Sequence, residues 1–112
     1  MDIFRKAIRI LMLACAVMHI CSCQSKPIKA LVVSGQNNHN WQVSHKVLKQ
    51  ILDNSGLFVT DIALTAPAGG DMTTFKPDFS QYDVVVLDYN GDRWPAETDS
   101  AFVKYVRKGG GV

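Results

Sequence analysis

The chain has 112 residues and a formal net charge of +2, a size that fits one domain at most. The charge is uneven, because Arg5, Lys6 and Arg9 lie in the first ten residues, whereas from Cys23 onward basic and acidic residues are equal in number, nine of each. A neutral body without a basic stripe gives no electrostatic reason to expect a nucleic-acid partner. No cysteine follows Cys23, which excludes a disulfide framework, a thiolate metal site and a cysteine nucleophile in the body.

Residues 1–23 have the three parts of a bacterial export signal. A basic start precedes the mainly apolar stretch Ile10–Ile20, far shorter than the ~20 apolar residues that a membrane-spanning helix needs. The segment ends Ile20-Cys21-Ser22-Cys23, which resembles a lipobox with an aliphatic residue three positions before the lipidated cysteine. We therefore expect lipidation at Cys23, a polar tether over residues 24–27, and a membrane-anchored location in the cell envelope, periplasmic or at the surface. A cleaved soluble signal peptide and a short uncleaved anchor are the alternatives.

The body begins with a nearly continuous apolar run, Ile28–Val33, which ends at Ser34-Gly35. Such a run, rich in Val and Ile, is typical of a strand buried on both faces of a parallel sheet. After a polar loop, apolar spacing predicts a helix with Asn40 as its N-cap and Gly56 as its C-terminal stop. The stripe consists of Trp41, Ser44, Val47, Leu48, Ile51 and Leu52.

A second strand is expected over Leu57–Leu64, followed by an irregular stretch, Thr65–Tyr82, with at most a turn of helix near Phe79. The third strand, Asp83–Asp88, is the clearest in the chain. Pro95 is expected as the first residue of a second helix, which the run of glycines at 109–111 ends. Its apolar face is Ala101, Phe102, Tyr105 and Val106.

This alternation of strands and helices predicts an α/β fold, a three-layer parallel sheet with right-handed crossovers. A further strand should follow the second helix, with Val112 as its first residue. We therefore interpret residues 28–112 as the first part of a larger domain, cut off after about three strands and two helices. A genuine small three-stranded domain is the alternative, although so short a body would bury a thin core.

Two loops follow the carboxyl ends of the predicted strands, where parallel sheets bind their ligands. The first is dense in amide side chains, and His39 and Trp41 flank the start of the helix. Amides beside an aromatic face suit sugar recognition, so Asn38, His39 and Trp41 are candidate site residues. The alternative is a polar turn in which Trp41 belongs to the ordinary core.

The second loop follows the third strand and supplies Asp88, Asn90 and Gly91 as candidate ligand-binding residues. Asp88 would orient a base or bind a metal, and a bend at Gly91 would present a backbone N–H as an oxyanion donor. The alternative is a helix-entry loop in which Asp92 pairs with Arg93.

Several signals of other functions are absent from the sequence. It has no G-x-G-x-x-G, no P-loop and no G-x-S-x-G elbow, so we expect no nucleotide cofactor. His45 follows His39 by six residues, which is not a helical metal spacing, and we expect His45 to pack or to face solvent. No metal site is predicted.

Four segments, in this order and spacing, resemble the N-terminal part of the ThuA-like (trehalose-utilisation) family. They are residues 30–35, His39-Asn40-Trp41 with the helix that ends at residues 52–56, residues 82–87, and residues 102–111. The resemblance spans residues 28–112 and about half of a family domain. It implies a flavodoxin-like fold of the class I glutamine amidotransferase-like kind.

The resemblance also implies a role in carbohydrate metabolism, on a disaccharide or a keto-sugar. His39 and Trp41 match the family's first-loop His-x-Trp, which makes His39 a candidate catalytic residue and Trp41 a candidate sugar platform. Asn90 and Gly91 lie where relatives with amidotransferase activity build part of an oxyanion hole. A further family histidine is expected beyond Val112.

The leading hypothesis is thus an exported ThuA-like protein that acts on, or binds, a sugar. The alternatives are a non-catalytic sugar-binding or scaffold module at the membrane surface, and an inactive truncated product. We expect the 112-residue chain by itself to lack catalytic activity.

Overall fold

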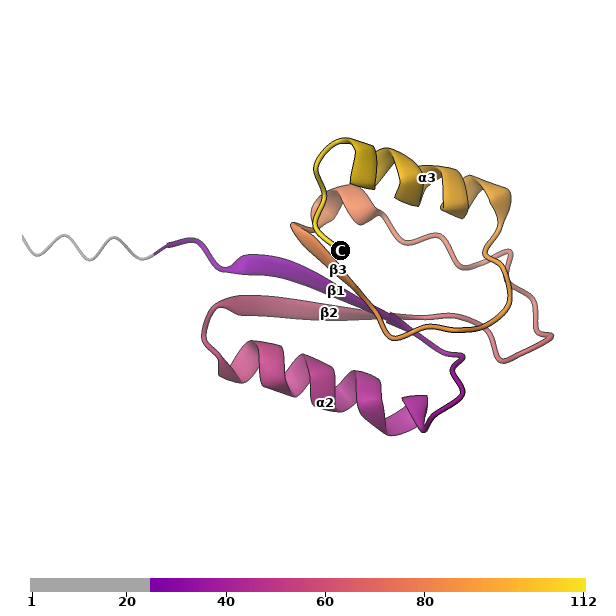
Figure 1. Cartoon of the computed structure of the whole chain (residues 1–112), viewed down its shortest axis with the longest axis horizontal. Coiled ribbons are helices and arrows are strands. Elements are labelled where there is room, and N and C mark those ends of the chain that lie inside the picture. Colours follow the sequence, from indigo (N-terminus) through magenta and orange to yellow (C-terminus); the bar gives the residue numbers. More distant parts are fainter. Residues whose placement is uncertain (1–24) are drawn as a thin grey trace, which may run out of the picture.

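The computed structural model describes residues 25–112 as three layers, with a parallel sheet between two helices (Figure 1). Helix α2 (Trp41–Asn54) covers one face of the sheet, and helix α3 (Ala96–Arg107) lies over the other. The predicted export segment and its Cys23 lie outside the described residues. Within residues 25–112, no helix is both long and apolar enough to cross a membrane.

Strand β1 (Ile28–Ser34) is the centre of the sheet, between β2 (Phe58–Leu64) and β3 (Val84–Leu87), and both pairs are parallel. The order β2-β1-β3 is the beginning of the flavodoxin-like strand order, so the predicted fold class is confirmed. Residues 30–34 of β1 are all buried, because other elements cover both faces of this strand. This double burial is why the run lacks the alternation of a half-exposed strand.

Helix α2 begins and ends at the predicted positions. Gly56 has a φ of +71°, and its N–H bonds to the carbonyl oxygen of Asp53 at 3.0 Å. Glycine enters this left-handed conformation at little cost, which makes it a frequent end of a helix. Asn40 occupies the N-cap position, although its side chain makes no capping hydrogen bond.

The inner face of α2 agrees with the predicted apolar stripe only in part, because Trp41, Ser44, Leu48 and Leu52 are half-buried but two other members are exposed. His45 is only 5% exposed, whereas Val47 and Ile51 are 44% and 61% exposed. The polar flank of the helix is held against β2, because the Thr60 N–H donates a hydrogen bond to Asp53 at 3.0 Å and Nζ of Lys49 donates one to the Thr60 carbonyl oxygen. These bonds to β2 leave the flank of Val47 and Ile51 turned away from the sheet edge.

The main apolar core lies on the α3 side of the sheet. Buried side chains from β1, β3, α3 and the segment between β2 and β3 form it: Leu31, Val33, Phe75, Phe79, Val85 and Tyr105. Phe79 belongs to the 3-10 helix η1 (Phe79–Gln81), which confirms the predicted turn. Its ring centroid lies 5.2 Å from that of Phe102 and 6.0 Å from that of Trp94. The irregular segment thus contributes core side chains although it contains only this one turn of helix.

Helix α3 shows two differences from the sequence expectation. Pro95 is its N-cap, so the helix begins one residue later than predicted, at Ala96. Thr98 and Tyr105 are its buried residues, whereas Ala101 is exposed and Val106 is 43% exposed. Thr98 can be buried because its hydroxyl donates a hydrogen bond to the Phe75 carbonyl oxygen at 2.7 Å.

Beyond α3, the backbone turns back to the outer edge of β3. The Val85 N–H bonds to the Gly111 carbonyl oxygen at 2.9 Å, and the Gly111 N–H bonds to the Asp83 carbonyl oxygen at 3.0 Å. These bonds form an isolated parallel bridge between Val84 and Gly111, which agrees in place and direction with the strand expected there.

Replacing Phe79 with alanine should destabilise the fold by about 3–5 kcal/mol, because the ring is 2% exposed and contacts three other aromatic rings. The control is Val103→Ala on α3, whose side chain is 48% exposed and which should cost at most about 0.5 kcal/mol. Urea unfolding followed by circular dichroism measures both. Equal small losses would show that η1 does not anchor the core.

Candidate functional site

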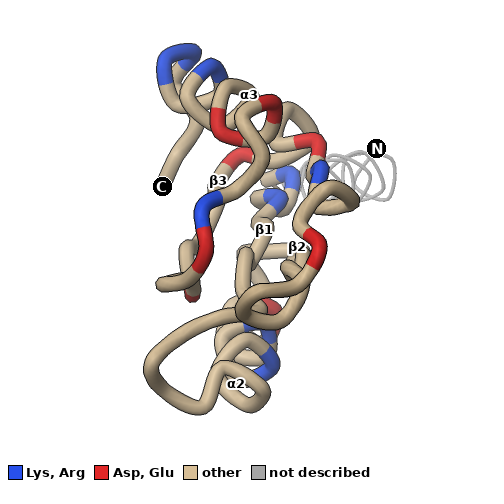
Figure 2. The backbone as a smooth tube through the Cα atoms, turned by 90° about the vertical axis from the view of Figure 1, so that its right-hand side faces the viewer, with Lys and Arg blue, Asp and Glu red and all other residues tan. Residues whose placement is uncertain are grey.

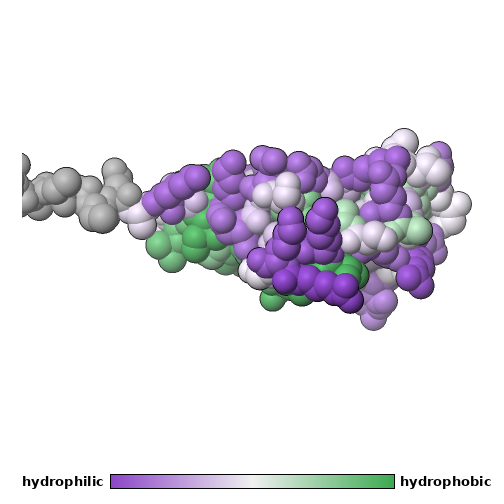
Figure 3. Space-filling view, turned by 90° about the horizontal axis from the view of Figure 1, so that it is seen from above, coloured by the Kyte–Doolittle hydropathy of each residue, from purple (hydrophilic) through white to green (hydrophobic). Residues whose placement is uncertain are grey.

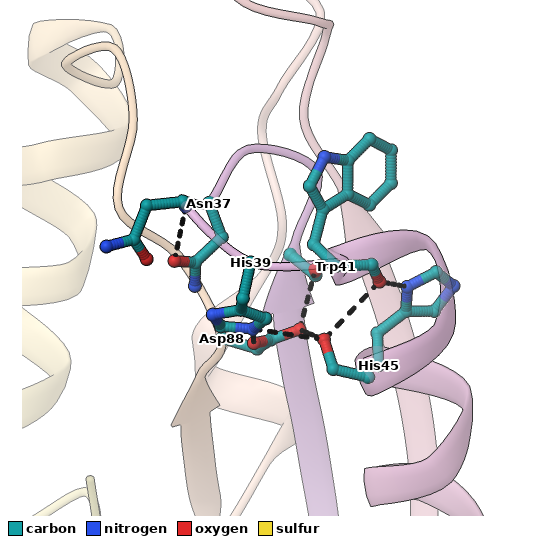
Figure 4. Close-up of polar contacts among 8 residues, drawn as sticks. Asn37, His39, Trp41, His45 and Asp88 are labelled. Carbon is teal, nitrogen blue, oxygen red and sulfur yellow. Dashed lines mark hydrogen bonds and ion pairs between the residues drawn. The ribbon is translucent and has the colours of Figure 1, made fainter.

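The two loops singled out in the sequence meet at one edge of the sheet. Strands β1 and β3 are adjacent and parallel, so the segments that follow them leave the sheet side by side. The Asp88 N–H bonds to the Val33 carbonyl oxygen at 2.9 Å, which places Asp88 beside the end of β1. The start of α2 lies at the same edge (Figure 4).

A buried carboxylate, Asp88, is the centre of this site. Its Oδ2 accepts hydrogen bonds from the Ser34 hydroxyl at 2.9 Å and from the Ser44 hydroxyl at 2.7 Å. Its Oδ1 lies 2.9 Å from Nε2 of His39. Burial of Asp88 opposes ionisation, but the hydrogen bonds from Ser44, Ser34 and His39 outweigh burial and hold the pKa of the carboxyl below its ordinary value. Asp88 is therefore an anion at neutral pH.

The charge of Asp88 decides how His39 is protonated. An ionised carboxylate only accepts hydrogen bonds, so Nε2 of His39 carries the proton that bonds to Asp88. In the neutral imidazole, Nδ1 then holds the free lone pair. The His39 side chain is 50% exposed, so this lone pair lies on a ring that solvent and ligands reach. The pair has the arrangement of a histidine base that a carboxylate orients.

The presence of Ser44 does not make this site a serine-hydrolase triad. In such a triad, the serine and the carboxylate bond to different nitrogens of the histidine. Here the Ser44 hydroxyl lies 3.3 Å from Nε2, the same nitrogen that bonds to Asp88. Ser44 therefore holds Asp88 in place and is not activated as a nucleophile.

Both serines are site residues beyond those predicted from the sequence. Ser34 ends the first predicted strand, and Ser44 belongs to the predicted apolar stripe of the helix. A hydroxyl in the middle of an apolar stripe is a signal that could have identified Ser44, because a polar group on a buried face needs a hydrogen-bond partner. The partner itself, Asp88, is 44 residues away and is found only in the fold.

Trp41 and His45 form a second pair on the first turn of α2. Nδ1 of His45 donates a hydrogen bond to the Trp41 carbonyl oxygen, and the two ring centroids are 6.0 Å apart. His45 is thus a packing residue, one of the two roles expected for it. In Figure 4 the half-buried indole of Trp41 extends from the helix start, away from the contact between His39 and Asp88.

The remaining predicted residues lie around the rim. Asn38 and Asn90 are both exposed, and the Asn90 N–H bonds to the Gln36 carbonyl oxygen at 2.9 Å. Within the described part of the chain, no three His, Cys, Asp or Glu side chains come together as metal ligands.

Gln36, a third site residue beyond those predicted from the sequence, connects the loops at this edge. Gln36 is only 5% exposed. Its Nε2 donates a hydrogen bond to the Ala66 carbonyl oxygen, and its Oε1 accepts one from the Asp92 N–H, each at 2.8 Å. A Cβ at position 91 would overlap with the Gln36 side chain, so Gly91 has a packing reason to be glycine. Asp92 pairs with the Gly69 N–H at 2.6 Å.

Arg93 does not pair with Asp92, the alternative considered for this loop. Its Nε lies 2.8 Å from Asp99 on α3.

Comparison with known proteins gives one informative relationship. No family model matches the chain, and no curated protein matches it. The crystal structure of a "putative ThuA-like protein" from Parabacteroides merdae ATCC 43184, at 1.75 Å resolution, matches with a TM-score of 0.76 and 62% sequence identity. The match covers 78% of this chain and 31% of that chain. This similarity supports the predicted relationship of the chain to the ThuA-like family. The chain spans about a third of the length of this ThuA-like relative.

Gly91→Ala should destabilise the protein by about 1–3 kcal/mol, because the added methyl group displaces the Gln36 side chain. The same change should cost much less in a Gln36→Ala background, where the obstructing side chain is absent. A double-mutant cycle from urea unfolding therefore gives a coupling of about 0.5–3 kcal/mol. Additive losses would mean that the contact does not constrain position 91.

Asp88→Asn should lower stability at pH 7, and the difference from the unsubstituted chain should shrink in acid. The pKa of Asp88 is lowered in the folded protein, so its contribution is present above the unfolded pKa of ~3.9 and is lost as pH falls through the folded value. Urea unfolding at pH 7, 5 and 3 measures this difference. A difference that stays constant with pH would contradict an ionised Asp88.

Proposed function

We propose that this chain is part of an exported ThuA-like lipoprotein in which the Asp88–His39 pair serves proton transfer or ligand orientation on a carbohydrate. The observation that carries the proposal is the 2.9 Å contact between Asp88 and Nε2 of His39, with two serine hydroxyls on the other carboxylate oxygen. This arrangement supplies a histidine with a fixed tautomer at the edge of the sheet where ligands bind.

The chemistry of the rim supports a sugar as the ligand. Asn38 and Asn90 are exposed amides that both donate and accept hydrogen bonds, as sugar hydroxyls require. The half-buried Trp41 at the start of α2 supplies an apolar ring face. The ThuA-like resemblance favours a disaccharide or a keto-sugar, and we propose no cofactor.

The reaction itself belongs to the longer protein. The match covers 31% of the ThuA-like relative, so further groups around the substrate are expected from residues without a counterpart in this chain. In that setting Nδ1 of His39 takes or returns the proton of a sugar hydroxyl. Asp88 orients the ring.

The proposed location is the cell envelope, with the chain held to the membrane by acyl groups on Cys23. The support is the order of a basic start, a short apolar stretch and Ile20-Cys21-Ser22-Cys23 in the sequence. Acyl chains bind through buried CH₂ groups worth ~0.8 kcal/mol each, so attachment needs no membrane-spanning helix.

Sugar binding can be tested by the fluorescence of Trp41. The chain has two tryptophans, so a Trp94→Phe background leaves Trp41 as the single indole. Titration with trehalose, and separately with a keto-sugar, should change its emission in a saturable way. His39→Ala should weaken binding roughly tenfold, the equivalent of one hydrogen bond, with Asn54→Ala at the far end of α2 as the control.

The result that would overturn the proposal is saturable sugar binding that His39→Ala leaves unchanged. Absence of any sugar-dependent signal with either sugar would count against carbohydrate as the ligand of this edge.

A further inference from the structure

The edge of the sheet opposite the candidate site carries a cluster of cations, which we name the basic edge. All five are exposed: Lys26, Lys29, Lys104, Arg107 and Lys108. Within residues 25–112, the ion pairs involve other residues and none of these five. The cluster is absent from the linear sequence, because the first two residues are separated from the last three by more than seventy positions.

The fold brings these cations together because every strand of the parallel sheet begins at this edge. The Lys29 N–H bonds to the Asp83 carboxylate at 2.8 Å, and the Gly111 N–H bonds to the Asp83 carbonyl oxygen at 3.0 Å. Asp83 thus joins the start of β1 to the turn after α3. Figure 1 shows the chain entering β1 at the same end of the molecule at which α3 finishes.

Two carboxylates at this end, Asp78 and Asp83, reduce the positive charge of the basic edge but are outnumbered by its five cations. Asp78 accepts hydrogen bonds from the Ser80 hydroxyl at 2.6 Å and from the Gln81 amide at 3.1 Å, and Asp83 bonds to backbone as described, so within residues 25–112 neither forms an ion pair with these cations. At the other end of α3, by contrast, Glu97 pairs with Lys76 and Asp99 with Arg93, at 3.0 and 2.8 Å. Figure 2 marks the basic and acidic residues along the backbone. A body with no net charge therefore has one cationic end.

Exposed apolar side chains accompany the cations at this end. Ile28 is 39% exposed, Leu57 is 59% exposed and Val106 is 43% exposed. The Ile28 N–H bonds to the Leu57 carbonyl oxygen at 2.9 Å, so these two residues are neighbours. Figure 3 shows apolar surface next to the point where the chain enters the domain. Cations beside apolar side chains are the composition of surfaces that bind at a membrane interface.

We propose that the basic edge rests on an anionic lipid surface, so that the Asp88–His39 site is directed away from the bilayer. The inference relies on the proposed attachment at Cys23, which precedes Ile28 by five positions and so lies within about 18 Å of it. Strand β1 has 7 residues and separates the two edges by roughly 20 Å.

The dipole of α3 accounts for only part of the basic edge. Cations in the last turn of a helix are favoured by its negative end, which explains Lys104 and Arg107 without a membrane. Lys26 and Lys29 belong to no helix and lie beside the segment that leads to Cys23. Lys26 and Lys29 therefore lie where residues that face the tethering membrane are expected to lie.

The first test compares binding of the full, unlipidated chain to vesicles of phosphatidylcholine alone and with phosphatidylglycerol. Lys104→Gln with Lys108→Gln should reduce the preference for phosphatidylglycerol roughly 30-fold, from two lost contacts with anionic lipid. The matched control is Lys76→Gln with Arg93→Gln, which removes the same charge at the opposite end and should change the preference by less than about threefold. Equal losses in the two double variants would overturn the proposal.

The second test measures which end of the molecule approaches the lipid. Leu57→Trp at the basic edge and Val43→Trp at the start of α2 place an indole at exposed positions of the two ends. In a Trp41→Phe, Trp94→Phe background, phosphatidylcholine with brominated acyl chains, mixed with phosphatidylglycerol, should quench the indole at 57 and spare that at 43. The reverse pattern would overturn the proposal. The sugar titration contains no lipid, so it reports on the Asp88–His39 site independently.

Discussion

The hydrogen bonds to the Asp88 carboxylate connect the end of β3 with the end of β1, with α2 and with the loop between β1 and α2. Ser34 comes from the end of β1, Ser44 from α2 and His39 from the loop between them, while Asp88 itself follows β3. A buried anion without such partners would be costly, and with them it becomes a fixed acceptor at neutral pH. The tautomer of His39 follows from that charge, and so does the position of the free lone pair.

The two faces of the sheet have different roles. On the α3 face, aromatic side chains around Phe79 and Trp94 supply the apolar core. On the α2 face, hydrogen bonds hold the helix, through Asp53 to β2 at one end and through Ser44 to Asp88 at the other. The site is built on the polar face, where a buried hydroxyl finds a partner and does not interrupt an apolar core.

The two edges of the sheet also differ in chemistry. One edge holds the Asp88–His39 pair with amides on its rim, and the other holds cations that make no ion pair within residues 25–112, together with exposed apolar side chains. Because all strands are parallel, the point where the chain enters the domain is on the opposite edge from the loops of the candidate site. The proposed tether at the N-terminus would therefore leave the candidate site facing away from the membrane.

The sequence by itself determined the class of fold and the loops of the candidate site. The buried run of β1, Gly56 at the end of α2 and the clear β3 specify parallel α/β structure, since these signals depend only on local spacing. Asp88 and His39 were recognised for their chemistry and their places after strands. Their mutual contact, the supporting roles of Ser34, Ser44 and Gln36, and the burial of His45 in place of Val47 were decided by tertiary structure alone. The contacts of these site residues are with partners 30 or more residues away in the sequence. The burial of His45 depends on the hydrogen bonds that hold one flank of α2 against β2. Local periodicity encodes neither kind of contact.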